Sequence, residues 1–383
     1  MSADFAGRIA VRGPLRIGVL RLTDSAPVIV AHEFGFFAEE GIETMLHVEP
    51  SWANIADKLA YGALDAAVML PPLALAMTLG LRGPAEPLII PYCISLGGNA
   101  LTLRKDLVPT ARPNLEGVVG TLRDLGEKAV LGVVHDHSPH NLLLRYWLAT
   151  AGAVAGRDYR IAVVPPALTL DALQSGRIAG FCAGAPWGEV AARSGVGFEL
   201  ARSDDFWRNS PEKCLAVRSA VALNAPDRLD GLLRALYLAA RFCDAPENST
   251  YVASLLSRRA HLDVDSHAIL SSLPGGPGGR SHSRFLAHAA TFPWRSHALW
   301  FLTQMRRWGL LPAEANLQSA ANIYRPDLYA RALKPLSVPI PLDDAKLEGA
   351  HLQTWSAPAA PVAIPMFPDA FCDGAIFNPD AIA

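Results

Sequence analysis

The chain has 383 residues, more than one hydrophobic core usually supports, so its length favours two domains. Apolar residues make up 51% of it and charged residues 18%, a composition that argues against intrinsic disorder. The formal net charge is −2 and no block of Lys and Arg runs along the chain, so a nucleic acid is not expected as a direct ligand. No apolar run reaches the roughly 18 residues that a membrane helix needs. Selective binding of an anion would therefore depend on a few placed side chains.

Strands and helices alternate in the first part of the chain. Continuous apolar runs indicate buried strands, and glycines close the predicted helices at Gly41 and Gly62. The predicted elements are a strand over 15–22, a helix over 28–41, a strand over 43–50, a helix over 51–62 and a strand over 64–72. This alternation predicts an α/β lobe with a mostly parallel sheet and helices on both faces.

A second set of the same units begins near residue 128 and predicts a second lobe. It consists of a strand over 128–135, a helix over 141–152 and a strand over 159–166. A further strand over 214–222 is followed by helix-rich sequence over 227–318, which a Pro/Gly-rich break interrupts at 271–279. The tail over 335–383 is rich in Pro and Ala, so we expect irregular chain that wraps the surface and carries little core.

The first residues and the cysteines bear on the compartment. Residues 1–20 lack the positive, apolar and small-residue regions of a secretory signal. The five cysteines are odd in number and far apart, without a C-x-x-C pair or a metal-ligand spacing. We therefore expect a reduced, cytoplasmic protein, periplasmic only if an export signal was removed, with no disulfide scaffold and no zinc site.

Residues that directly follow the predicted strands are the candidates for ligand contact, because ligands of open α/β sheets lie beyond the carboxyl ends of the strands. These positions are polar, aromatic or small. They are 23–27, 49–54, 70–72, 97–99, 135–141, 184–187 and 211–213, and they include Pro72, Pro186 and Trp187.

Three histidines, His135, His137 and His140, lie within six positions and raise the question of a metal site. Neither a His-Glu-x-x-His helix nor a cysteine pair accompanies them, so we expect no metal. A solvated or helix-capping histidine is the alternative. His140 lies where a strand ends and a helix begins, and the free N–H groups of a helix start favour an anion.

Three other residues could contact an anion. Trp52 begins a helix after a strand, although a tryptophan there could equally fill the core. Lys213 precedes an apolar strand and could neutralise a monoanion, with a solvated lysine as the alternative. Asn99 follows two glycines and could donate its amide, with a turn-forming asparagine as the alternative.

Catalytic motifs are missing from the sequence. There is no G-x-S-x-G elbow, no Walker loop, no dinucleotide-binding glycine fingerprint after the first strand, and no nucleophile signature. We therefore expect a binding protein that needs no cofactor and is not an enzyme.

Several long motifs together resemble the nitrate-binding family of ABC-transporter receptors and its cytoplasmic relatives, the NasS-type nitrate/nitrite sensors. The resemblance spans about residues 15 to 329. The motifs that carry it are LTDSAPVIVAHEFGFFAEEG from residue 22, SWANIADKLAYGALDAAVMLPP from 51, HNLLLRYWLATAG from 140, GFCAGAPW from 180, SPEKCLAVR from 210 and LTQMRRWG from 302.

The resemblance implies a two-lobed fold of the type II periplasmic-binding-protein kind, with nitrate or a related planar anion in the cleft between the lobes. Trp52 would pack on the anion, Asn99 would stand where transport receptors tend to have Gln, His140 would donate a hydrogen bond, and Lys213 would supply charge. A chain that crosses twice between lobes predicts a first lobe from 14–104 and 220–334, a second lobe from 105–219, and the C-terminal segment 335–383.

Departures from the transport receptors favour the sensors. Transport receptors have a Gly-Gly-Thr-His-Asp loop where this chain has Ser138-Pro139-His140-Asn141, which is closer to the sensor form. Ala185 stands where relatives usually have an acid, which bears on ligand choice or on the lobe interface. Sensors of this type release an ANTAR-class antiterminator when nitrate or nitrite binds, which the resemblance implies here. The alternatives are a receptor that delivers nitrate, nitrite, bicarbonate or an organosulfonate to an ABC permease, and an enzyme of thiamine-pyrimidine synthesis on the same fold.

Overall fold

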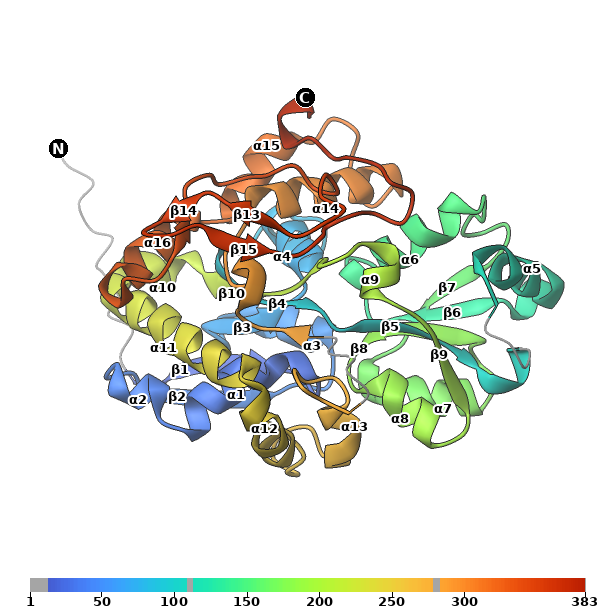
Figure 1. Cartoon of the computed structure of the whole chain (residues 1–383), viewed down its shortest axis with the longest axis horizontal. Helices are drawn as coiled ribbons and strands as arrows, with labels where there is room; N and C mark the ends of the chain where they lie inside the picture. Colours follow the sequence, from blue (N-terminus) through green and yellow to red (C-terminus); the bar gives the residue numbers. More distant parts are fainter. Residues whose placement is uncertain (1–12, 109–112, 278–282, 383) are drawn as a thin grey trace.

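The computed structural model describes residues 13–108, 113–277 and 283–382 of the chain. Two sheets lie side by side in it, each with helices on both faces, and each sheet with its helices forms one lobe (Figure 1). This is the α/β, two-lobed architecture of periplasmic binding proteins that the sequence predicts.

The first lobe is built on a six-stranded sheet with the strand order β11-β4-β10-β3-β1-β2. Its strands are β1 (Leu15–Val19), β2 (Thr44–Val48), β3 (Ala66–Met69), β4 (Leu88–Gly97), β10 (Pro211–Arg218) and β11 (Ser283–Arg284). The second lobe is built on a five-stranded sheet with the order β7-β6-β8-β5-β9. Its strands are β5 (Asn99–Arg104), β6 (Val130–Val133), β7 (Arg160–Val163), β8 (Gly180–Gly184) and β9 (Gly197–Arg202).

Helices connect and cover these strands, and a short 3-10 turn, η1 (Thr23–Ser25), follows β1. The helices are α1 (Ala26–Glu33), α2 (Phe36–Glu39), α3 (Trp52–Ala60), α4 (Pro71–Thr78), α5 (Leu115–Leu125), α6 (Pro139–Thr150), α7 (Thr169–Gln174), α8 (Trp187–Arg193), α9 (Ser203–Phe206), α10 (Ser219–Asn224), α11 (Pro226–Asp244), α12 (Ser249–Leu256), α13 (Ser266–Leu270), α14 (Arg295–Arg307), α15 (Leu317–Ala320) and α16 (Pro326–Leu333).

Most of the predicted elements are present with shorter bounds. The predicted helix over 28–41 is the exception, because it divides into α1 and α2 at Gly35, whose φ of +81° a helix does not accommodate. The Pro/Gly-rich break predicted at 271–279 is only partly described, since residues 278 and 279 lie outside the described residues.

The sheets are mixed, so the prediction of mostly parallel sheets is wrong in this detail. β1 pairs in parallel with β2 and β3, and β6 pairs in parallel with β7 and β8. The strands next to the crossings, β4, β5, β9 and β10, pair antiparallel. The reason is that a strand arriving directly from the other lobe enters its sheet without a crossover helix, so it need not run parallel.

The two crossings lie earlier in the chain than the predicted boundaries at 104/105 and 219/220. β4 ends in the first sheet at Gly97 and β5 begins in the second at Asn99. Gly97 and Gly98 have φ of +68° and +91°, backbone angles that only glycine adopts easily, so they allow the sharp turn. The return crossing runs through α9 to β10, which belongs to the first sheet. The sheets therefore assign 99–104 to the second lobe and 211–218 to the first.

Two apolar clusters form the core. One fills the face of the first sheet that α1 and α11 cover, and the other runs from α3 and α4 of the first lobe into α6 and β8 of the second. Packing that is continuous between the lobes fixes their relative position near the crossings. No helix among the described residues is long and apolar enough to cross a membrane.

The C-terminal segment 335–382 carries more structure and core than expected. It crosses the top of the molecule over α14 as two short antiparallel ribbons, β12 (Ile340–Pro341) with β14 (Ala359–Ala360) and β13 (Trp355–Ala357) with β15 (Ile364–Met366) (Figure 1). Phe371 is buried against Trp207 and Trp300, and the hydroxyl of Tyr146 on α6 donates to Asp373 at 2.8 Å. Its aromatic and acidic residues thus tie it to both lobes, which a Pro/Ala-rich composition does not reveal.

Candidate functional site

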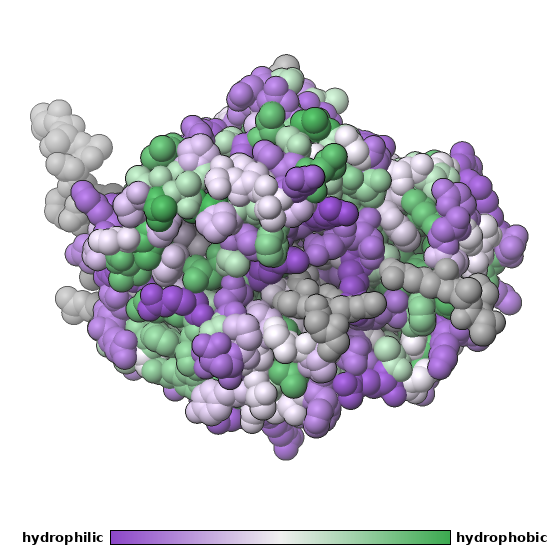
Figure 2. All heavy atoms as spheres, in the orientation of Figure 1, coloured by the Kyte–Doolittle hydropathy of each residue, from purple (hydrophilic) through white to green (hydrophobic). Residues whose placement is uncertain are grey.

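A buried cation lies where the two lobes meet. The side chain of Lys213 is fully buried, and its Nζ lies 2.9 Å from Oδ2 of Asp24 and contacts Oε1 of Glu212. The same nitrogen lies 5.5 Å from the ring centroid of Trp52, within the range of a cation–π interaction. Figure 2 shows hydrophilic residues near the middle of this face, between the two lobes of Figure 1.

An irregularity in β10 explains why two neighbouring side chains reach the same point. Successive side chains of a regular strand point to opposite faces of the sheet. The pairing of β10 with β4 shifts register between Pro211 and Lys213 and again between Lys213 and Cys214. A bulge of this kind re-aims side chains. Glu212 and Lys213 consequently meet each other instead of pointing apart.

The first turns of α3 and α6 place the ring of Trp52 and the imidazole of His140 near Lys213 and Glu212. Ser51 caps α3 by accepting from the backbone N–H of Asn54, which makes Trp52 the first helical residue. Ser138 caps α6 in the same way, so His140 lies in the first turn. Both side chains are buried, and Nε2 of His140 lies 3.3 Å from Oε1 of Glu212.

Asn99 joins this group from the first crossing. Its Nδ2 donates to Oε2 of Glu212, and its backbone N–H donates to the hydroxyl of Ser203 on the return crossing at 2.9 Å. The structure therefore brings together Trp52, Asn99, His140 and Lys213, the four residues that the sequence assigns to an anion. We call them, with Asp24 and Glu212, the junction cluster.

The junction cluster contains two acids that the sequence analysis missed. Asp24 follows β1, in the range 23–27 that the strand-end rule marks, and Glu212 directly precedes Lys213. Their positions were therefore visible in the sequence. Their role was not, because an anion site was expected to offer donors, and carboxylates are acceptors when ionised.

Burial and the single cation set the protonation states of the cluster. Burial raises the pKa of Glu212 to about 7 and raises the pKa of Asp24, since one ammonium faces two buried carboxylates. Burial and the charge of Lys213 hold the pKa of His140 well below its usual value, so its ring is neutral. The two carboxylates outweigh burial and raise the pKa of Lys213, which stays charged.

Several polar atoms of the cluster are buried without a hydrogen-bond partner. They are Oδ1 of Asp24, Nε1 of Trp52, Oδ1 of Asn99, and Nδ1 and Nε2 of His140. Buried polar groups are nearly always paired, and a group of orphaned atoms in one place indicates a ligand or water that completes them. Both hydrogen-bond donors and acceptors are free here, so an anion would complete the donors, whereas the acceptors need a donor such as a water molecule.

Gly184 keeps the space between two members of the cluster open. A Cβ at this position would lie 3.5 Å from Oδ2 of Asp24 and 3.7 Å from Nε2 of His140. The last residue of β8 thus leaves room for atoms beside the imidazole and the carboxylate.

The predicted residues Pro186 and Trp187 lie at the lobe interface. Nε1 of Trp187 donates to the backbone oxygen of Arg21 at 3.0 Å. The backbone N–H of Thr23 donates to the backbone oxygen of Ala185 at 2.8 Å. These bonds tie the start of α8 in the second lobe to the segment after β1 in the first. Their contact with a ligand stays a prediction, as does that of Pro72, which is buried in the first turn of α4.

The three histidines do not converge. His135 and His137 have ring centroids 5.8 Å apart, and Nε2 of His137 lies 3.4 Å from the oxygen of Leu310. Burial lowers the pKa of His135 to about 3. His140 faces Glu212 instead. Within the part of the chain that the structure describes, no group of three or more His, Cys, Asp or Glu side chains could hold a metal ion.

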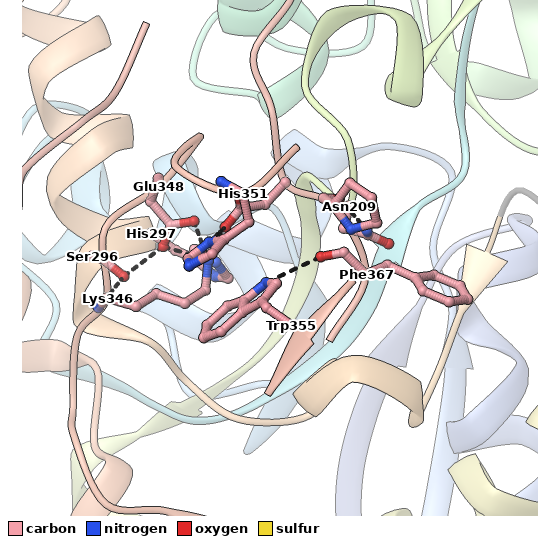
Figure 3. Close-up of polar contacts among 10 residues, drawn as sticks. Asn209, Ser296, His297, Lys346, Glu348, His351, Trp355 and Phe367 are labelled. Atoms are coloured by element: carbon pink, nitrogen blue, oxygen red, sulfur yellow. Dashed lines mark hydrogen bonds and ion pairs between the residues drawn. The ribbon is translucent and has the colours of Figure 1, made fainter. Parts of the chain in front are cut away.

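A second, partly buried cation provides an internal comparison. Nζ of Lys346 contacts Glu348 (Figure 3). It also lies 3.5 Å from Oδ2 of Asp369 and 5.8 Å from the ring centroid of Trp294. His297 is buried 3.4 Å from Glu348. This arrangement holds the C-terminal segment on α14 and repeats the lysine, the tryptophan, the two acids and the histidine of the junction cluster.

The fold and the junction cluster are those of a two-lobed substrate-binding protein. Residues 12–257 match the model of the NMT1-like family, and the chain belongs to this family. It is homologous to nitrate-binding and related ABC-transporter substrate-binding proteins.

Individual relatives agree with this family assignment. The chain is 30% identical to the nitrate/nitrite binding protein NrtA of Synechocystis over 85% of this chain and 77% of that protein. It is 34% identical to the bicarbonate transport ATP-binding protein CmpC of Synechococcus elongatus over 85% of this chain and 50% of that protein. The crystal structure of the periplasmic nitrate-binding protein NrtA from Synechocystis superimposes with a TM-score of 0.83 at 26% identity, covering 96% of each chain. The chain spans about half the length of the ATP-binding relatives it matches.

Proposed function

We propose that this protein binds nitrate or nitrite at the junction cluster and works as a sensor that holds an ANTAR-class antiterminator inactive until the anion binds. The observation that carries the proposal is the burial of Lys213, His140, Asn99 and Trp52 together between the lobes, with orphaned donors on Trp52 and His140. A small planar anion would satisfy these donors, and charge-assisted bonds from Lys213 are the stronger kind.

The lobes supply different parts of the cluster, which gives the anion a means to act on a partner. Trp52 and Lys213 belong to the first lobe, whereas Asn99 and His140 belong to the second. An anion that contacts both lobes stabilises the closed arrangement over the open one by its differential affinity. The antiterminator would accordingly bind the open form, and coupling between the two ligands is reciprocal.

The start of α6 supports the sensor over the transport receptor, because Ser138-Pro139-His140-Asn141 resembles the sensor form. The test is a reconstituted complex of the full chain with an ANTAR-class antiterminator. We expect co-elution in gel filtration without anion and separation when nitrate or nitrite is added. A complex that survives millimolar nitrate and nitrite, or that never forms, would contradict the sensor role.

The second candidate is a substrate-binding component of an ABC transporter, with bicarbonate as a further ligand. Two observations favour it. Relatives of the chain are named as nitrate import and bicarbonate transport proteins, and the junction cluster contains two carboxylates. Bicarbonate carries a hydroxyl that can donate to an ionised carboxylate, whereas nitrate carries only acceptors. Binding to a permease together with indifference to the antiterminator would favour this candidate.

A further inference from the structure

The carboxylate of Glu212 already occupies two of the donors that the proposed anion needs, the side-chain amide of Asn99 and the ammonium of Lys213. Oε2 accepts from Nδ2 of Asn99, Oε1 contacts Nζ of Lys213, and Nε2 of His140 lies 3.3 Å from Oε1. A carboxylate is planar and presents two acceptor oxygens, as one edge of a nitrate ion does. In the described structure Glu212 therefore stands in the place of an external oxyanion.

The net charge of the junction cluster opposes the entry of an anion while Glu212 is ionised. With His140 neutral, Lys213 is the one positive charge in the junction cluster, and Asp24 and Glu212 carry two negative charges when both are ionised. A monoanion that enters this buried group would make its net charge more negative, from −1 to −2. Uncompensated charge in a site without water is among the most costly features a protein can contain.

We propose that Glu212 is a resident competitor of the anion, so that nitrate enters the junction cluster together with one proton, which the buffer acid in the solvent releases and Glu212 accepts. This proposal rests on the proposed function, because it assumes that the anion binds here. The proton converts Glu212 from an acceptor into a donor, and it restores the net charge to −1. One anion and one proton are taken up, and no bond other than the O–H forms.

Every group that faces Glu212 is consistent with this role. Lys213 neighbours it on β10, Asn99 faces it from β5 and His140 from α6, and Asp24 on η1 acts on it through charge. Cys182 on β8 is a neutral thiol, whose pKa burial and the charge of Glu212 raise. Asp24 is the weaker candidate, since it contacts Lys213 but neither Asn99 nor His140 by a hydrogen bond or ion pair. Burial raises the pKa of Glu212 to about 7, so the proton exchanges near neutral pH.

Calorimetry of the full wild-type chain with sodium nitrate tests the proposal without any variant. We expect the apparent affinity to fall roughly tenfold between pH 6 and pH 8, because the protonated fraction of a group with a pKa near 7 falls by that factor. Titrations at pH 7.5 in two buffers with different ionisation enthalpies should reveal uptake of about three-quarters of a proton for each nitrate, because about a quarter of Glu212 is already protonated at this pH.

The variant Glu212→Gln isolates the effect of the Glu212 charge, because glutamine keeps the shape of the side chain and removes its charge. We expect its nitrate affinity at pH 8 to exceed that of the wild type, to stay constant between pH 6 and pH 8, and to involve no proton uptake. Glu348→Gln is the matched control, since Glu348 is also buried beside a lysine but belongs to the second cluster. This control should keep the pH dependence of the wild type.

The outcomes separate the two proposals. Nitrate binding by the wild type that does not change with pH and takes up no proton would overturn the role of Glu212 and leave the proposed function intact. Glu212→Gln that folds and keeps the pH dependence would overturn it as well. Absence of nitrate, nitrite and bicarbonate binding at every pH would instead defeat the proposed function.

Discussion

Nζ of Lys213 lies 2.9 Å from Oδ2 of Asp24, so the cation that the sequence offers to an anion is already paired within its own lobe. Asp24 and Lys213 are far apart in the chain and meet only because β1 and β10 belong to one sheet. A buried pair of this kind orients the ammonium and limits its charge. Anion affinity therefore depends on acids as well as on donors.

Replacing Lys213 with Met should weaken both stability and binding. It leaves Asp24 and Glu212 buried without a cation, so the free energy of unfolding at pH 8 should fall by about 3–5 kcal/mol. Loss of a charged donor should reduce nitrate affinity roughly 10- to 100-fold. Lys346→Met is the matched control, with a similar loss of stability in urea unfolding but unchanged affinity. Equal affinity losses in the two variants would contradict the assignment of Lys213.

His140 and His137 should differ in their effect on binding. His140→Ala removes a ring that lies within the junction cluster, and it should lower nitrate affinity roughly tenfold. His137→Ala removes a ring near the oxygen of Leu310 and should change affinity less than twofold. Isothermal titration of both proteins compares them directly. Equal losses would mean that the wrong histidine has been assigned.

Trp187 should act on lobe closure. Trp187→Phe keeps most of the apolar contact but removes the hydrogen bond from Nε1 to the oxygen of Arg21, a bond worth about 1 kcal/mol. Since this bond joins the lobes, the variant should bind nitrate about fivefold more weakly while its melting temperature changes little. An unchanged affinity would show that the bond does not contribute to closure.

Gly184→Ala should reduce binding without unfolding the protein. The added methyl would lie 3.4 Å from Cδ2 of Leu22, an ordinary contact, and it would fill space between Asp24 and His140. We expect a melting temperature close to that of the wild type and weaker nitrate binding, measured by thermal denaturation and calorimetry. Unchanged binding would place the anion away from β8.

Stability should depend on pH through Glu212. The pKa of its carboxyl in the folded protein, about 7, lies above the ordinary value of 4.5, so the folded state binds the proton more tightly than the unfolded state. The stability that this proton provides is fully present below pH 4.5 and is lost as the pH rises through 7, a change of about 3 kcal/mol. Urea unfolding of Glu212→Gln should lack this decline, and a variant profile parallel to the wild type would contradict it.

The residues of the site were predictable to the extent that local rules govern them. Ser51 and Ser138 cap α3 and α6, and these caps place Trp52 and His140 at helix starts, as the sequence indicates. Lys213 was predicted directly before an apolar strand, but its partners were not predicted. The bulge in β10 that turns Glu212 toward it arises from pairing with β4, a long-range contact that local sequence does not encode.

The same distinction applies to the fold. Alternating strands and helices predicted two α/β lobes, because this pattern is local. The crossing points were misplaced because β5 is an ordinary apolar strand in sequence, and only its pairing with β8 and β9 assigns it to the second lobe. The buried Glu348 of the C-terminal segment escaped prediction for a similar reason, since its partners Ser296 and His297 lie on α14.

Calorimetric titration of the full chain with nitrate and with nitrite, at pH 6 where Glu212 is largely protonated, is the decisive measurement of anion binding at the junction cluster. We expect saturable binding of one anion per chain at micromolar to millimolar concentration, weakened in Lys213→Met and retained in Lys346→Met. Absence of heat and of saturation with both anions up to millimolar concentration would contradict it.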